Sequence, residues 1–159
     1  AAMDSAWTTF QREQVTEVVR AVRDSLHALR PELVLSAAVI ADTARAERAN
    51  AQPWRDWLED GLLDRAFLMC YAPSVQTVMD QLGALTERFG ATDRVVPGIA
   101  VFNTSTTTVA SKIKGARTLG FPLIALYSYD SLYAKSPGWA RLRDRLDISG
   151  DTTPQRRTD

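Results

Sequence analysis

Four strand-like runs alternate with helix-like runs along this chain of 159 residues, and the alternation limits the fold more than any other feature. The strand-like runs are Leu33–Ala41, Arg65–Tyr71, Val95–Asn103 and Phe121–Tyr129. Strands that alternate with helices are typical of parallel βαβ units. Four such units make half of a (β/α)8 barrel, and ligands of such folds bind at the carboxyl ends of the strands. We therefore predict an α/β fold with four parallel (β/α) units.

Apolar residues at helical spacing predict the helices that flank these strands. The predicted helices are Phe10–Leu29, Pro53–Asp60 with Gly61 just past its end, Val75–Phe89 with Ser74 as its cap, a helix that follows Thr104–Thr108 and ends at Gly120, and a short helix over Trp139–Leu146. Residues 43–52 are predicted to form a loop of mixed charge. We expect one partial barrel domain over residues 1–148 and a disordered polar tail over residues 149–159.

Composition limits the classes of partner. The 19 basic and 19 acidic side chains cancel, so net charge gives no reason to expect binding to nucleic acid or to an anionic membrane. No apolar run reaches the roughly 18 residues of a membrane span. The first residues lack the basic and apolar stretches of a signal peptide, and Met3 is not the first residue. We therefore expect the sequence to start at a truncation point, so the missing signal peptide does not indicate the cellular compartment.

Several kinds of chemistry are not expected from this sequence. Cys70 is the single cysteine, so no internal disulfide is possible, and its place in a buried strand predicts an inert core thiol. His27 is the single histidine and lies on the exposed face of a predicted helix, so neither a metal site nor a serine or cysteine triad is predicted. No glycine-rich phosphate loop is present, and no cofactor is predicted.

The first strand-like run separates into a smaller and a larger set of side chains. The smaller set is Val34, Ser36, Ala38 and Ile40, which suits the narrow interior of a barrel, and the larger set is Leu33, Leu35, Ala37 and Val39. Asp42 continues the alternation of the smaller set, two residues after Ile40. We therefore expect the Asp42 carboxylate at the mouth of the barrel.

The chain resembles a known family in six short segments. They are Phe10–Glu13, Leu35–Val39, Asp56–Asp64, Met69–Tyr71, Pro97–Ile99 and Leu126–Asp130. In order and spacing they are similar to the C-terminal half of the catalytic domain of bacterial glycosyl hydrolase-like family 10 proteins, which are distinct from the xylanases that share the number. The similarity extends over roughly residues 7–139.

The resemblance implies a (β/α)8 barrel that hydrolyses O-glycosidic bonds of a polysaccharide, with the glycan of peptidoglycan as one plausible substrate. It also suggests a secreted or cell-envelope location. Such families carry an acidic motif on an earlier strand, and this sequence begins after that position. We therefore expect the main catalytic acid upstream of residue 1, in a missing N-terminal half-barrel, and expect this fragment alone to be inactive.

Glycoside hydrolysis uses two carboxyl groups, and two aspartates lie at predicted strand ends. Asp42 follows the first strand and Asp130 follows the fourth, so both are candidate catalytic residues, although their strands are not neighbours in a barrel. The alternative for Asp42 is a helix or turn cap, and the alternative for Asp130 is a turn residue.

Three more strand-end side chains are candidates for binding a carbohydrate substrate. Tyr71 and Tyr129 offer an aromatic face and a hydroxyl, and Asn103 offers a donor and an acceptor. The alternatives are packing under a loop for Tyr71 and capping of the next helix for Asn103, and parity does not decide whether Tyr129 points inward. Trp54 and Trp57 lie on an outer helix, where core packing is favoured over sugar stacking.

A second interpretation is not enzymatic. A four-unit module with two open sheet edges could act as a scaffold or carbohydrate-binding unit through self-association, since unpaired strand edges favour pairing with another chain.

Overall fold

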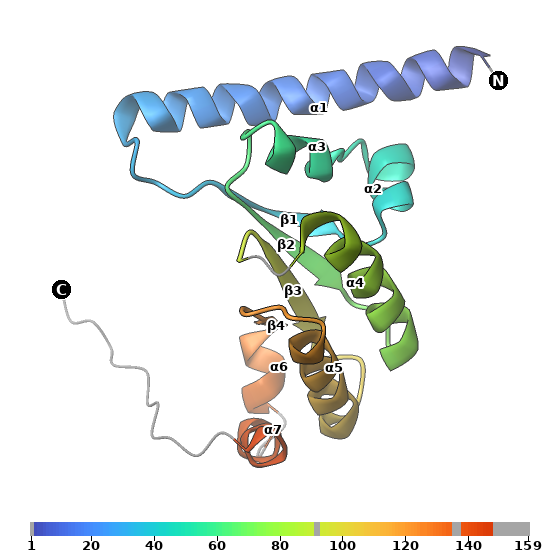
Figure 1. Ribbon diagram of the computed structural model, residues 1–159, viewed down its shortest axis with the longest axis vertical. Coiled ribbons are helices and arrows are strands. Elements are labelled where there is room, and N and C mark those ends of the chain that lie inside the picture. The colour runs from blue at the N-terminus through green and yellow to red at the C-terminus, as the bar shows by residue number, and fades with distance from the viewer. Residues whose placement is uncertain (1, 91–92, 135–137, 148–159) are drawn as a thin grey trace.

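A computed structural model describes residues 2–90, 93–134 and 138–147, where the four strands form one parallel sheet in the order β1-β2-β3-β4 (Figure 1). The strands are β1 (Ser36–Ile40), β2 (Arg65–Cys70), β3 (Val95–Ala100) and β4 (Ala125–Tyr127). A helix follows every strand, so the predicted α/β fold of four parallel (β/α) units is confirmed. The predicted tail, residues 149–159, lies outside the described residues.

The helices are α1 (Ala2–Leu29), α2 (Thr43–Asn50), α3 (Trp54–Glu59), α4 (Val75–Phe89), α5 (Thr106–Thr118), α6 (Tyr129–Ala134) and α7 (Gly138–Leu146). Two differ from prediction in extent. Helix α1 begins eight residues earlier than expected, because residues 2–9 contain no proline or glycine that would stop it. Most of the predicted loop over residues 43–52 is α2, in which alanines alternate with charged helix formers.

The strands are shorter than predicted, and a helix that was not predicted follows β4. Leu33 and Val34 are exposed and precede β1, because β1 is an edge strand that is paired only where it meets β2. The fourth strand begins at Ala125 instead of Phe121. It ends at Tyr127, and Tyr129 already belongs to α6.

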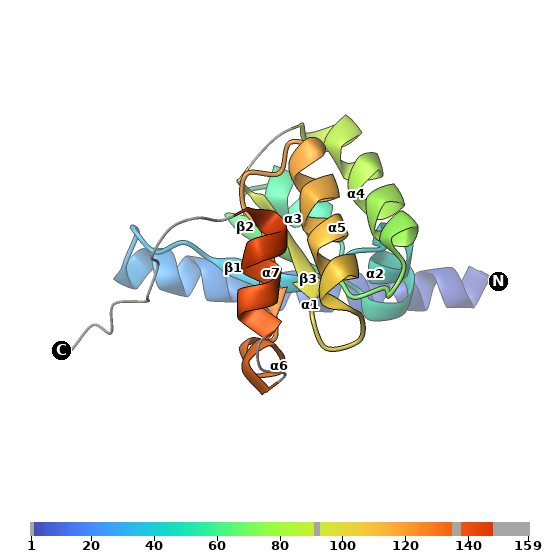
Figure 2. The same ribbon diagram turned by 90° about the horizontal axis from the view of Figure 1, so that it is seen from below.

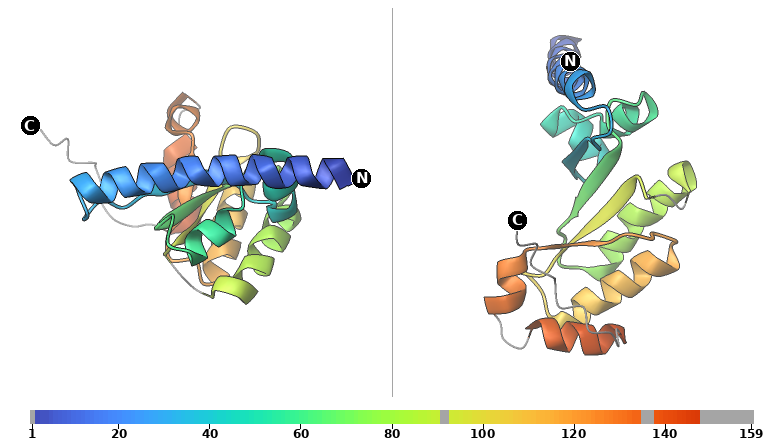
Figure 3. Two further views of the ribbon diagram at one scale, coloured as in Figure 1. Left: turned by 90° about the horizontal axis from the view of Figure 1, so that it is seen from above. Right: turned by 90° about the vertical axis from the view of Figure 1, so that its left-hand side faces the viewer.

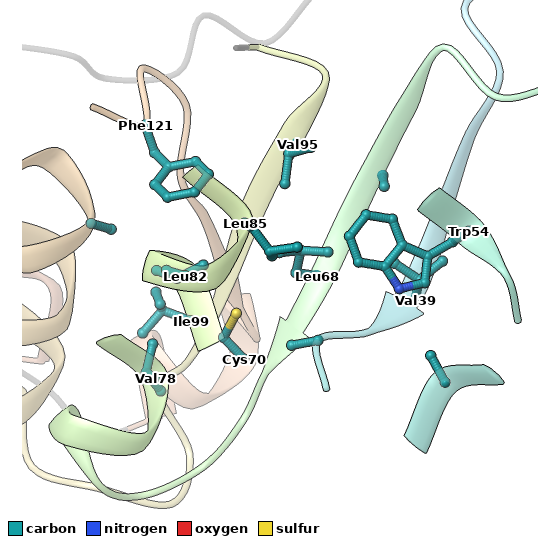
Figure 4. Close-up of a cluster of buried hydrophobic side chains, with 14 of the residues drawn as sticks. Val39, Trp54, Leu68, Cys70, Val78, Leu82, Leu85, Val95, Ile99 and Phe121 are labelled. Atoms are coloured by element: carbon teal, nitrogen blue, oxygen red, sulfur yellow. The ribbon is translucent and has the colours of Figure 1, made fainter. Parts of the chain in front are cut away.

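One face of the sheet carries the core. Helices α4 and α5 cover β2 and β3 on this side (Figure 2). Val78, Leu82 and Leu85 of α4 lie close to Leu68, Cys70 and Ile99 in Figure 4, and all six are at most 3% exposed. Burying a side chain of this size contributes roughly 1.5–3 kcal/mol.

The two tryptophans of α3 extend the core to β1, as predicted. Trp54 is 1% exposed and stacks on Phe89 with ring centroids 6.2 Å apart. Trp57 is 3% exposed, and its indole N–H donates to the Thr16 hydroxyl over 2.9 Å, which ties α1 to α3.

Among the described residues, no helix lies beside β2 and β3 on the opposite face of the sheet, as the right-hand view of Figure 3 shows. On this bare face Ser36 and Ala38 are exposed, and Phe67 and Met69 are half-buried. The predicted parity of the first strand is therefore correct, since the smaller set of side chains points away from the helices.

The outer edge of β1 is partly occupied by side chains. The backbone carbonyl of Leu35 points toward β2, where it accepts from the N–H groups of Asp64 and Arg65. Because backbone groups alternate in direction along a strand, the N–H and carbonyl groups of the even-numbered residues of β1 point toward the open edge. At Ile40 both backbone groups have partners: the N–H donates to Gln52 Oε1 over 3.2 Å, and the carbonyl accepts from Trp54 Nε1 over 3.1 Å.

Pro97 is accommodated in β3, although a proline weakens a central strand. The Val101 N–H donates to the Tyr127 carbonyl, so the odd-numbered residues of β3 direct their backbone nitrogens toward β4. The ladder with β4 starts only at Gly98 and Ala125. The missing N–H of Pro97 therefore lies before β4 begins and leaves no ladder bond unmade.

Helix α1 is amphipathic, and part of its apolar surface is exposed. Val15 and Val19 pack against the core, whereas Trp7, Phe10, Val18, Val22 and Leu29 are each between 44% and 79% exposed. We call these five residues the α1 stripe. No helix of the described chain combines the length and apolar character needed to cross a membrane.

Substituting Gly98 by alanine should destabilise the protein by about 1–3 kcal/mol, because the new Cβ would lie 2.7 Å from the Leu68 carbonyl oxygen of β2. Gly83 of α4 is the matched control. A Cβ there meets nothing within 4 Å, so Gly83→Ala should be neutral or stabilising by roughly 0.5–1 kcal/mol. Urea unfolding curves measure both, and equal effects of the two variants would contradict the close approach of β2 and β3.

The Cys70 thiol should be nearly unreactive in the folded protein. Burial raises its pKa to about 12, against smaller opposing contributions from the Gly98 backbone and the charge of Lys112. At pH 8 its alkylation by iodoacetamide should be roughly 1,000-fold slower than in urea-unfolded protein, because the thiolate is the nucleophile. Mass spectrometry over time measures both rates, and fast labelling of folded protein would contradict a buried Cys70.

Candidate functional site

The carboxyl ends of the four strands lie at one edge of the sheet, where ligands of parallel α/β folds bind. Asp42 follows β1, Tyr71 follows β2, Phe102 and Asn103 follow β3, and Tyr127 ends β4.

Three aromatic rings from three successive strands meet at this edge. Tyr71 and Tyr127 stack with ring centroids 5.3 Å apart and planes at 16°. Phe102 packs edge-on against both, at 5.9 Å from Tyr71 and 6.1 Å from Tyr127. We call these residues the aromatic cluster. Phe102 is 43% exposed and Tyr127 is 54% exposed, so the cluster presents a large aromatic surface to solvent.

The strand register explains how two residues from non-adjacent strands reach one another. Ala100 of β3 pairs with Tyr127, and Tyr71 lies one residue beyond the pair of Cys70 with Ile99, which also places it beside Ala100. The methyl group of Ala100 is fully buried. Because this central side chain is small, the two tyrosine rings can lean over it and stack.

Packing in the cluster also affects Tyr71 electrostatically. Desolvation raises the pKa of the Tyr71 phenol above its usual range, and the neighbouring Tyr127 adds to the shift. The phenol therefore stays protonated at neutral pH. It keeps an O–H donor beside an apolar ring, a combination that suits a ligand with both hydroxyl groups and C–H faces.

Asn103 is held against the end of β2. Its side-chain amide donates to the Tyr71 carbonyl over 2.8 Å. The alternative in which Asn103 caps the next helix is wrong, since Ser105 is the cap of α5 and accepts from the Thr108 N–H. Its proposed contact with substrate remains a prediction.

Asp42 caps α2, as the structural alternative for this residue predicted. Its Oδ1 accepts from the Arg45 N–H over 3.0 Å, and the residue is exposed. A catalytic role for Asp42 remains a prediction. A cavity of about 270 Å³ lies beside it, lined in part by Arg55, Asp80 and Gln81.

Tyr129 and Asp130 do not lie at a strand end, and in this respect the sequence prediction is wrong. Both belong to the first turn of α6, because the chain turns into a helix directly after Tyr127. Tyr129 stacks on Tyr133 with centroids 4.3 Å apart, and the two rings are 67% and 47% exposed. Asp130 is exposed on the same helix.

Sequence reasoning missed Phe102, Tyr127 and Lys112. Phe102 and Tyr127 both lie on the bare face of the sheet. The sequence alone does not show this, because it depends on how β3 and β4 are paired. Lys112 lies within the stripe of Val109, Ile113 and Ala116 on α5, so its helical position was the available signal for burial.

The described residues contain no cluster of three or more His, Cys, Asp or Glu side chains that could hold a metal ion. A second cavity, of about 310 Å³, lies between α5, α6 and α7 and is lined in part by Thr106, Val109 and Arg141. Val101 also lines this cavity. Side chains alternate between the two faces of a sheet, and Val101 lies on the helix-covered face, so the cavity is on the side away from the aromatic cluster.

Comparisons with known proteins agree with the fold. Residues 1–114 match the family described as glycosyl hydrolase-like 10. No curated protein matches the chain. The structure of the PgaB (BpsB) glycoside hydrolase domain from Bordetella bronchiseptica is similar, with a TM-score of 0.69 and 18% sequence identity. The similarity covers 94% of this chain and 46% of that chain, so this chain spans less than half the length of the solved relative.

Proposed function

Because the chain belongs to the glycosyl hydrolase-like 10 family, we propose that it supplies part of the substrate site of a glycoside hydrolase that cleaves O-glycosidic bonds of a polysaccharide. The glycan of peptidoglycan is one candidate substrate. The observation that carries the proposal is the aromatic cluster of Tyr71, Phe102 and Tyr127 at the carboxyl edge of the sheet.

The chemistry of the cluster suits a sugar ring. The C–H face of a pyranose packs on an aromatic ring, and its hydroxyl groups need donors and acceptors at the edge of that ring. Two phenol groups and the amide of Asn103 supply these at the ends of β2, β3 and β4. In the proposal, the tyrosine pair of Tyr129 and Tyr133 on α6 extends the binding surface.

Asp42 and Asp130 are the proposed catalytic carboxylates, and in the proposal each acts with another carboxyl group instead of pairing with the other. They follow β1 and β4, the two outer strands of the sheet. At about 4.8 Å per strand, these strands are roughly 14 Å apart. Retaining and inverting glycosidases place their two carboxyl groups about 5–5.5 Å or 6.5–9.5 Å apart. The spacing of the two strands therefore favours another carboxyl group as the catalytic partner of each aspartate.

The open edge of β1 and the exposed α1 stripe favour a second candidate function, a carbohydrate-binding scaffold that self-associates. This alternative keeps the aromatic cluster as a binding surface and removes hydrolysis. Binding of glycan without cleavage would favour it over the enzyme.

Replacing Tyr127 by alanine should raise the dissociation constant for peptidoglycan glycan strands freed of peptide about tenfold, because the variant removes half of the exposed stacked pair. Trp7→Ala is the matched control, since Trp7 is 59% exposed and stacks on Phe10 of α1, away from the strand ends. Isothermal titration calorimetry measures both. An unchanged dissociation constant for the Tyr127 variant, or an equal loss in the Trp7 variant, would exclude the cluster as the binding surface.

Replacing Asp42 by asparagine should lower glycan hydrolysis by the full-length protein at least about 100-fold, the loss expected when a carboxylate acts in catalysis. Asparagine also caps helices, so α2 should form normally and the variant tests the charge alone. Asp144→Asn on α7 is the control with an exposed aspartate. Reducing-end release measures the rates, and wild-type activity of the Asp42 variant would remove Asp42 from the mechanism.

A further inference from the structure

Lys112 is a charged side chain within the core, and the proposed chemistry leaves it without a role. It is fully buried on the sheet-facing side of α5, beside Val109, Ile113 and Ala116. Burying an ammonium group is unfavourable unless good partners replace its water. The burial lowers the pKa of Lys112, as expected for a desolvated cation.

The partner of Lys112 is a backbone carbonyl at the end of the neighbouring unit. Its Nζ donates to the Ala72 carbonyl over 2.6 Å. None of the ion pairs between described residues includes Lys112. Helical side chains lean toward the N-terminus of their helix, and the N-terminus of α5 lies at the carboxyl edge of the sheet, so the long stem of Lys112 reaches toward this edge.

Two consecutive carbonyls are therefore held by the same (β/α) unit. Asn103, after β3, donates to the Tyr71 carbonyl, and Lys112 of α5 donates to the Ala72 carbonyl. These bonds fix the chain as it leaves β2, which is the segment that carries the Tyr71 ring. A shift of this segment would move that ring relative to Tyr127 and Phe102.

We propose that Lys112 is a positioning residue for the aromatic cluster: by holding the Ala72 carbonyl, it keeps the Tyr71 ring stacked on Tyr127. Packing alone does not account for a lysine here, since a methionine of similar length would fill the space without desolvating a charge. The consequence for glycan binding rests on the proposed function, whereas the consequence for ring geometry does not.

The test compares Lys112→Met with Lys114→Met, which removes an exposed lysine from the same helix. Tyrosine-selective 13C labelling gives four ring signals, one for each tyrosine of the chain. In Lys112→Met the Tyr71 and Tyr127 signals should move toward their values in unfolded protein, and the Tyr129 and Tyr133 signals should not move. The midpoint of urea unfolding should stay the same or rise, because a buried charge is gone. Lys114→Met should change neither.

Unchanged Tyr71 and Tyr127 signals in folded Lys112→Met would overturn the inference. A fall in the urea midpoint without a change of ring signals would do the same, because it shows a purely structural role. If the methionine variant does not fold, Lys112→Leu replaces it, with the same expected signals.

A second readout uses glycan strands freed of peptide. Their dissociation constant should rise about tenfold in Lys112→Met, the loss expected when a charge-assisted bond no longer orders a binding group. If wild-type protein does not bind the strands at all, the proposed function fails, and the ring signals alone decide the role of Lys112.

Discussion

Gly98 brings β3 so close to β2 that a Cβ on it would lie 2.7 Å from the Leu68 carbonyl oxygen. Along the bare face of the sheet, β3 continues with Ala100, whose methyl group is fully buried. Because these central side chains are absent or small, the larger side chains of β2 and β4 can lean toward each other above β3. The stack of Tyr71 on Tyr127 depends on this arrangement, and so does the exposed aromatic surface at the carboxyl edge.

The order and type of most elements could be predicted from the sequence, because apolar periodicity and caps are local signals. Ser74 caps α4 and Gly90 ends it, as expected. The ends of the strands could not be predicted in the same way. Apolar residues continue beyond the paired part of β1 and precede β4, and only contact with a neighbouring strand decides where the ladder stops.

The candidate site could be predicted in part, because its position depends on where the strands end. The rule that ligands bind at strand ends selected Tyr71, which lies in the aromatic cluster, and Asn103, which holds the Tyr71 backbone. It selected Tyr129 instead of Tyr127, because the end of β4 was placed two residues too late. Lys112 escaped notice since lysine on a helix is usually solvated, and its burial depends on the loop after β2.

The side chains that bond the backbone of Ile40 also limit how another strand could extend the sheet beyond β1. Gln52 and Trp54 already bond the N–H and carbonyl of Ile40, so within the described strand β1 an incoming strand would find open backbone groups only at Ser36 and Ala38. Two residues provide few ladder bonds. Most of the affinity of any such assembly would then come from apolar contact with the α1 stripe, and strand pairing would add little.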